Sequence, residues 1–296
     1  MPAERPGTGL RLLLHTVVVT LVMTLITALC VQRMALAYGI NLSDLGSELA
    51  TVTARMHLRF ILIVNNLGTY AIPALLAAYL TYRGQWLRRI GLRRVERPYL
   101  VTGAAGVFLF SLPLVTVAAY LNLQLDLPQW MLQNEEQVEA LLNNVLRTDT
   151  GAELLVTLIT VAVVPGFAEE VLFRGLLQGR LLPKIMSGHA AIWVSATLFS
   201  AIHLEFAGFL PRLLLGAALG YSYRWTGSLW IPIVLHMLFN GLQVLVAYYT
   251  GSGPVEGEIG ENIGALAIPA VAGLAVIALL ARRNERLLRR AGDAPL

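Results

Sequence analysis

The sequence predicts an all-α protein, a polytopic integral membrane helical bundle of about eight transmembrane helices. Of the 296 residues, 56% are hydrophobic and only 14% are charged, whereas soluble domains carry about 25% charged residues. The mean hydropathy is +0.66. Eight apolar segments reach or approach the roughly 20 residues that cross a bilayer. They lie near 12–37, 58–82, 99–121, 153–175, 189–205, 209–224, 229–249 and 264–281.

The loops between these segments alternate in charge, which predicts an orientation. Basic residues follow every second segment, most densely at 83–97 and 282–290, and the other loops are acidic, at 44–48, 126–139 and 256–261. Loops rich in Lys and Arg stay in the cytoplasm. Both termini are therefore expected there, and the net charge of +4 is explained without nucleic acid, for which we find no recognition module.

Three regions follow from this pattern. Residues 1–150 hold the first three predicted spans and an amphipathic stretch, 128–147, whose apolar residues recur at helical spacing and which is expected to lie at the outer interface. Residues 151–250 hold the most polar spans and form the expected catalytic core. Residues 251–296 hold the last predicted span and a basic cytoplasmic tail.

Two adjacent acids, Glu169 and Glu170, lie in the fourth predicted span. An acid at the centre of a spanning helix costs about 2.5–3.5 kcal/mol even on mild scales, so such residues indicate function. Residues four apart share a helix face, and we expect Glu170 to pair with Arg174. Glu169 points about 100° away and is left as a general base. The structural alternative is that all three form an ion-pair network at a helix end.

Other polar residues lie in later apolar segments. His203 follows Phe199 by four residues, and Asn240 follows His236 by four, so each pair shares a face. A histidine and an amide can donate hydrogen bonds to a developing oxyanion. A base, an imidazole and an amide suffice for adding water to a peptide carbonyl.

Zinc is the alternative to a base that acts without metal. Glu169, His203 and His236 have the ligand types that zinc sites use, although the zinc motif HExxH is absent. We favour no metal and no other cofactor. Straight transverse helices would keep Glu169 and His203 apart, so we expect tilt, a break or a re-entrant segment. Pro165 and Gly166 can loosen the helix before the acids.

The three motifs together resemble the CPBP family, the CAAX-processing type II prenyl endopeptidases and their Abi-type immunity relatives. They read EEVLFR at 169–174, FSAIH at 199–203 and HMLFN at 236–240. The resemblance covers roughly 150–250 and implies a membrane endopeptidase, of glutamate or metalloendopeptidase type, in a bacterial cytoplasmic membrane.

The resemblance also implies roles for individual residues. Glu169 and His203 would activate water, and His236 and Asn240 would stabilise the oxyanion. Supporting positions would be Glu170, Arg174 and Phe199. The implied partners are the lipid bilayer and a protein or peptide substrate, which can be lipidated. Two other hypotheses stay open: an ion-coupled transporter that uses the same polar residues, and a non-catalytic immunity or scaffold protein.

Overall fold

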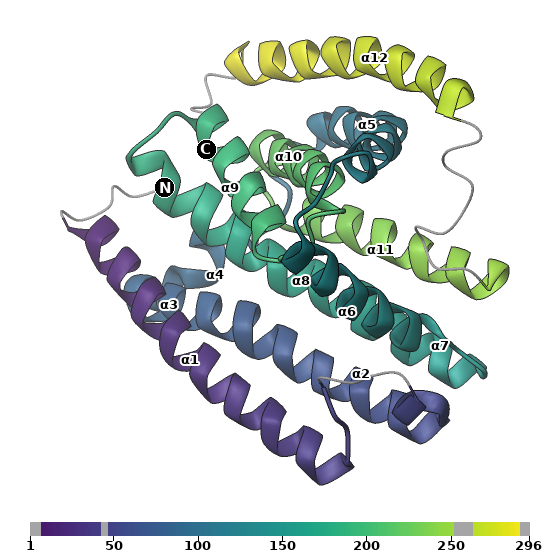
Figure 1. Cartoon of the computed structure of the whole chain (residues 1–296). Helices are drawn as coiled ribbons and strands as arrows, with labels where there is room; N and C mark the ends of the chain where they lie inside the picture. The colour runs from purple at the N-terminus through teal and green to yellow at the C-terminus, as the bar shows by residue number, and fades with distance from the viewer. Residues whose placement is uncertain (1–6, 43–46, 252–262, 291–296) are drawn as a thin grey trace. The chain divides into compact units, whose positions relative to one another are not determined.

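The computed structural model describes residues 7–42, 47–251 and 263–290, and every regular element within them is helical (Figure 1). This confirms the all-α class. Of the acidic loop residues, Asp44, Glu256, Glu258 and Glu261 lie outside the described residues. The α-helices are α1 Thr8–Tyr38, α2 Val52–Asn66, α3 Ile72–Tyr82, α4 Trp86–Arg89, α5 Val101–Leu123, α6 Gln129–Leu146, α7 Gly151–Leu158, α8 Val164–Glu170, α9 Gly188–Ala201, α10 Phe209–Thr226, α11 Trp230–Thr250 and α12 Ile263–Arg290.

Wider π-helical segments join some of these helices into longer runs. Leu67–Ala71 connects α2 to α3, Ile159–Val163 connects α7 to α8, and Val171–Leu181 follows α8. A π-helical turn holds an extra residue and is found frequently at functional sites. Two of the three segments flank the acidic pair, on either side of the short helix α8.

Six runs of helix in the described residues are long and apolar enough to cross a membrane, so the protein is an integral membrane protein. They are Thr8–Tyr38, Val52–Arg89, Pro98–Leu123, Gly151–Lys184, Trp230–Thr250 and Gly264–Arg290. The expected count of eight is corrected to six by this measure. The other two segments form α9, with 14 residues, and α10, with 18. At 1.5 Å per residue α9 is about 21 Å long, short of a hydrocarbon core of about 30 Å.

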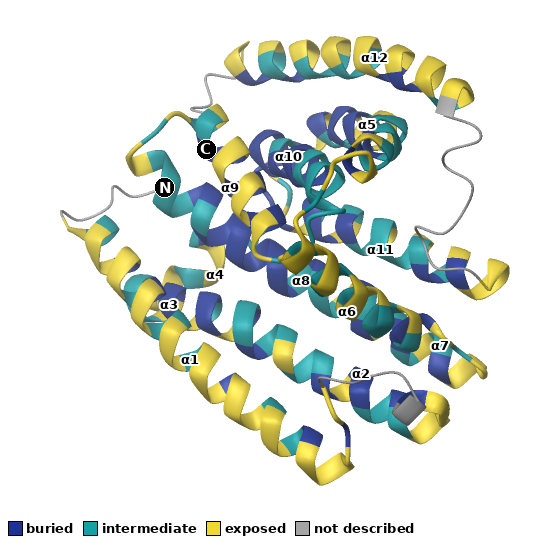
Figure 2. Cartoon of the chain, in the orientation of Figure 1, coloured by how far each residue is buried: buried dark blue, intermediate teal, exposed yellow. Residues whose placement is uncertain are grey.

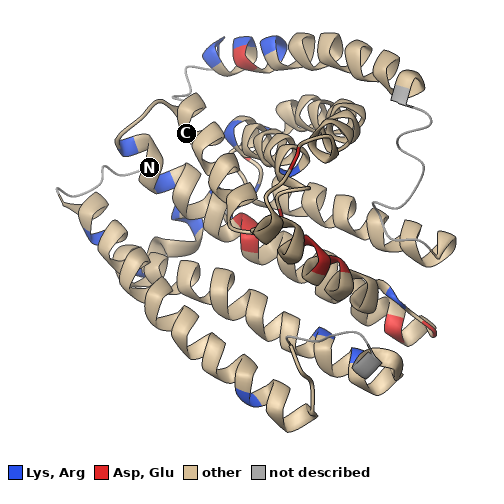
Figure 3. Cartoon of the chain, in the orientation of Figure 1, with Lys and Arg blue, Asp and Glu red and all other residues tan. Residues whose placement is uncertain are grey.

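The surfaces of the long helices suit a lipid environment. Apolar side chains such as Leu21 on α1 and Ile268 on α12 are 67% and 76% exposed, and Figure 2 shows exposed residues along both helices. Helices α5 and α11 carry no Lys, Arg, Asp or Glu (Figure 3). Where exposed residues are apolar, the solvent that covers them is expected to be lipid.

The chain divides into two compact units that interleave along the sequence. The first comprises residues 1–92, 137–176 and 236–254, and the second comprises residues 93–136, 177–235 and 255–296. The divisions fall inside α6, inside the π-helical segment after α8 and inside α11. The units therefore cut across the three regions expected from the sequence.

In the first unit α1 packs on α2 and α3, and α2 packs on α7 and α8. Hydroxyl side chains begin two of these helices, because Thr51 accepts a hydrogen bond from the Ala54 amide, and Thr150 accepts one from the Glu153 amide. Gly68, in the turn after α2, lies against Thr27 of α1 and leaves no room for a β-carbon. These contacts hold the end of α2 in place.

In the second unit α5 packs against both α10 and α12, and α10 also packs against α9. The α5–α12 contact is close: a β-carbon on Gly273 would lie 2.6 Å from the carbonyl oxygen of Phe110. Arg224 on α10 forms an ion pair with Glu285 on α12, at 3.1 Å. The expected amphipathic stretch forms α6.

Candidate active site

Glu170 is the centre of a buried ionic group in the first unit. Its Oε1 atom accepts a hydrogen bond from Arg174 Nη1 at 2.7 Å and one from His236 Nδ1 at 2.9 Å. The Glu170 and Arg174 side chains are essentially inaccessible. The ion pair expected from the four-residue spacing is therefore present, and the same carboxylate also fixes the ring of a histidine from α11.

Glu169 faces the other nitrogen of the same ring. His236 Nε2 lies 3.9 Å from Glu169 Oε2, while Glu169 Oε1 lies 3.5 Å from the amide nitrogen of Asn66 on α2. Glu169 is 5% exposed and His236 is 2% exposed. Because Nδ1 donates to Glu170, Nε2 is the nitrogen that can accept a proton. The two acids thus contact opposite sides of one imidazole.

The run of helix before the acids lacks one backbone donor, because Pro165 lies within it. Proline has no N–H, so the carbonyl of Val161, four residues earlier, loses its usual helical donor. Asn240 Nδ2 donates to this carbonyl at 3.0 Å. Asn240 therefore has a structural partner in addition to the oxyanion role expected for it, and its second amide hydrogen is available for another acceptor.

Gly166 lets α8 and α11 approach closely at the same point. A β-carbon there would lie 2.7 Å from Met237 Cγ and 3.1 Å from the Met237 backbone nitrogen. Met237 directly follows His236, so the missing side chain at 166 is what allows the imidazole to reach the acids. Pro165 and Gly166 do more than loosen the helix: each creates one specific contact with α11.

His203 lies in the second unit, whereas both acids lie in the first. Helix α9 ends at Ala201, so His203 lies in the turn that follows, and the expected helix boundary at 205 was wrong. Its Nδ1 donates to the Phe199 carbonyl at 2.7 Å, and the two rings meet edge to face. Nε2 is therefore the nitrogen that can take a proton.

The first half of α6 holds the turn after His203. The carboxylate of Glu135 accepts hydrogen bonds from the amides of Phe206 and Ala207, and Asn134 donates to the Leu204 carbonyl at 2.7 Å. Leu204 has a positive φ of 54°, which is uncommon for a branched side chain. This turn therefore depends on α6, which the sequence analysis expected only to lie at the outer interface.

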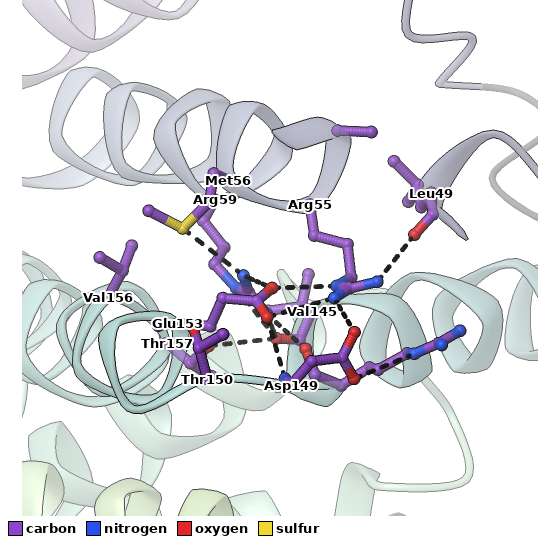
Figure 4. A network of polar contacts seen from close by, with 12 residues as sticks. Leu49, Arg55, Met56, Arg59, Val145, Asp149, Thr150, Glu153, Val156 and Thr157 are labelled. Atoms are coloured by element: carbon purple, nitrogen blue, oxygen red, sulfur yellow. Dashed lines mark hydrogen bonds and ion pairs between the residues drawn. The ribbon is translucent and has the colours of Figure 1, made fainter. Parts of the chain in front are cut away.

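Sequence reasoning also missed a buried ionic cluster between α2 and α7, which Figure 4 shows. Glu153 accepts hydrogen bonds from Arg55 at 3.0 and 3.2 Å and from Arg59 at 2.8 Å. Both arginines are 0% exposed and Glu153 is 1% exposed. Arg59 also donates to the carbonyl of Val145 at 3.1 Å. The sequence signal for this cluster was a pair of arginines, four residues apart, at the start of an apolar span.

No group of three or more His, Cys, Asp or Glu residues is placed to hold a metal ion, counting only described residues. Two of the three zinc-ligand candidates, Glu169 and His236, face each other in the first unit. The third, His203, lies in the second. The zinc hypothesis thus stays a prediction.

The fold and this site define a class: an all-α membrane protein with two buried carboxylates on either side of one histidine, one of them hydrogen-bonded to it. Residues 151–242 match the family described as type II CAAX prenyl endopeptidase Rce1-like. This segment carries all three motifs, and its match agrees with the resemblance that those motifs predicted.

Three curated bacterial proteins are each similar to this chain over 89 to 91 residues. The uncharacterized protein YpbD of Bacillus subtilis is 29% identical, over 29% of this chain and 42% of the relative. The membrane-embedded CAAX protease MroQ of Staphylococcus aureus is 31% identical, over 29% of this chain and 36% of the relative. The putative membrane peptidase YdiL of Bacillus subtilis is 26% identical, over 30% of this chain and 36% of the relative. The alignments thus span about two fifths of each relative. No solved structure matches.

Proposed function

We propose that this chain is an intramembrane endopeptidase that hydrolyses a peptide bond close to the membrane surface. The observation that carries the proposal is the buried imidazole of His236 between the carboxylates of Glu169 and Glu170. Buried ionisable residues in membrane helices are costly and indicate function. The similarity to proteins named as membrane proteases supports the reaction class.

In this proposal Glu169 is the general base. Its carboxylate takes a proton from water, and the oxygen of that water bonds to the carbonyl carbon of the peptide. Glu169 then returns the proton to the leaving nitrogen as the C–N bond breaks, which leaves a carboxylate and an amine. His203 assists through Nε2, since its Nδ1 is bonded to the Phe199 carbonyl.

The negative charge on the tetrahedral oxygen needs donors. In its protonated form His236 donates through Nε2, and the carboxylate of Glu170, 2.9 Å from Nδ1, balances the charge on the ring. Asn240 contributes its second amide hydrogen. Arg174 holds the Glu170 carboxylate in place through the 2.7 Å ion pair, and Phe199 holds the His203 ring.

The zinc version uses the same residues. Carboxylate and imidazole are suitable zinc donors, and the hydrogen bond from His236 Nδ1 to a carboxylate is the arrangement that commonly orients zinc-bound histidines. Glu169, His203 and His236 would hold the ion, which would polarise the carbonyl and activate water. We favour the metal-free version and propose a bacterial cytoplasmic membrane, cytoplasmic termini and a protein or peptide substrate that can be lipidated.

Cleavage of a quenched-fluorescence peptide by the purified protein in liposomes tests the proposal. Glu169→Gln and His203→Ala should each abolish cleavage while circular dichroism and detergent elution stay as in the wild type. Glu139→Gln, an exposed acid on α6, is the matched control and should cleave normally. Full activity in Glu169→Gln would discard the assignment of the base.

Three further measurements separate the remaining hypotheses. Chelator treatment with metal analysis of the active protein distinguishes the zinc and metal-free versions, because only the former loses activity with its metal. A scaffold or immunity role predicts no cleavage and a phenotype that survives Glu169→Gln. A transporter predicts substrate or proton flux across the liposome without any peptide product.

A further inference from the structure

Asn66 lies outside the segment that matches the family, yet its side chain contacts the proposed base. It is the last residue of α2, directly before the π-helical turn Leu67–Ala71. Its amide nitrogen is 3.5 Å from Glu169 Oε1, while Glu169 Oε2 is turned toward His236 Nε2. The two oxygens of one carboxylate are thereby given different surroundings.

The other end of the Asn66 amide has no such partner. Asn66 Oδ1 is buried and accepts no hydrogen bond from any described residue. A buried polar atom left in this state costs free energy, and an asparagine kept only for packing would be replaced at less cost by leucine. The unpaired Oδ1 atom therefore points to a polar group that donates a hydrogen bond to it during function.

Several contacts within the first unit fix α2 at this point. One helical turn after Asn66, the Tyr70 ring packs on Phe173, with centroids 6.4 Å apart. At the other end of α2, Arg55 and Arg59 are bound to Glu153 of α7 (Figure 4). With both ends of α2 attached to the run of helix that carries the acids, Asn66 is held where it contacts Glu169.

We propose that Asn66 is a positioning residue for Glu169 and its water. Its amide N–H restrains Oε1, so that Oε2 is the oxygen that takes the proton, and Oδ1 accepts the second hydrogen of the same water. This inference rests on the proposed hydrolysis. It extends the site beyond residues 151–242 to the N-terminal region, which the sequence motifs left without a function.

The test compares Asn66→Leu with Asn65→Leu, the same change one residue earlier at an exposed position. We expect Asn66→Leu to lower kcat by up to about 100-fold, the scale of a misplaced reacting group, with KM changed less than twofold and thermal stability equal to or above the wild type. Asn65→Leu should match the wild type in all three quantities.

Asn66→Asp provides a second arm, because it keeps the size and the acceptor oxygen but replaces the NH2 donor with a second oxygen. It should lose kcat as Asn66→Leu does. A kcat within twofold of the wild type in both Asn66 variants would overturn the inference. If Glu169→Gln were still inactive in that case, the proposed function would remain intact. A loss of kcat that tracks a loss of stability would equally overturn it. No cleavage by the wild type would overturn both.

Discussion

The Arg55–Arg59–Glu153 cluster predicts a large, specific loss of stability when its acid is neutralised. In Glu153→Gln the side chain keeps its size, but three hydrogen bonds from guanidinium groups lose their charged acceptor. Both arginines are fully buried. Breaking a buried pair by removing one partner costs about 3–5 kcal/mol, because the remaining charge is left uncompensated. We therefore expect Glu153→Gln to lower the free energy of unfolding by an amount in this range.

The control for this prediction is Asp149→Asn, which removes the other acid of the cluster. The Asp149 side chain is 48% exposed, and solvent-exposed ion pairs contribute about 1 kcal/mol or less. Unfolding in mixed micelles, followed by circular dichroism during titration with SDS, gives both free energies. Buried and exposed pairs should differ by more than about 1 kcal/mol. If the free energies of unfolding of Glu153→Gln and Asp149→Asn differ by less than this, the reasoning fails.

Three other predictions concern single contacts. Asn240→Leu should destabilise the protein by about 1–3 kcal/mol, because the Val161 carbonyl loses the donor that Asn240 supplies. Adding Pro165→Ala, which restores a backbone N–H, should recover stability but not cleavage. Recovery of both would exclude an oxyanion role for Asn240. Gly273→Ala should lower the melting temperature through a collision with the α5 backbone, whereas Gly264→Ala, whose methyl group meets nothing, should not. Glu135→Gln should speed amide hydrogen exchange in the turn after α9, and unchanged exchange would show that α6 does not hold that turn.

The sequence predicted the helical class and the partners within one helix, because both depend on local spacing. The ion pair between Glu170 and Arg174 is such a case, as it needs only four residues and a helix. Contacts between distant segments were not accessible in this way. Asn66 and Glu169 are separated by 103 residues, and a single asparagine in an apolar run carries no signal of its partner.

Helix lengths were overestimated where a polar turn contains apolar residues. The stretch around His203 is apolar enough to extend a predicted span to 205, yet α9 stops at Ala201. The α6 side chains that satisfy the backbone of this turn come from some 70 residues earlier in the chain. Hydropathy cannot distinguish a turn stabilised in this way from the continuation of a helix.

The widened turns on either side of α8 have a consequence for how such a site can change. Consecutive residues on a helix differ by about 100° in direction, so gaining or losing one residue in Ile159–Val163 would rotate everything after it by one position. An insertion of this kind would move Glu169 to the position that Glu170 now occupies and would carry Glu170 one position further, without altering either codon. Helical phase thus decides which of the two acids contacts which nitrogen of His236.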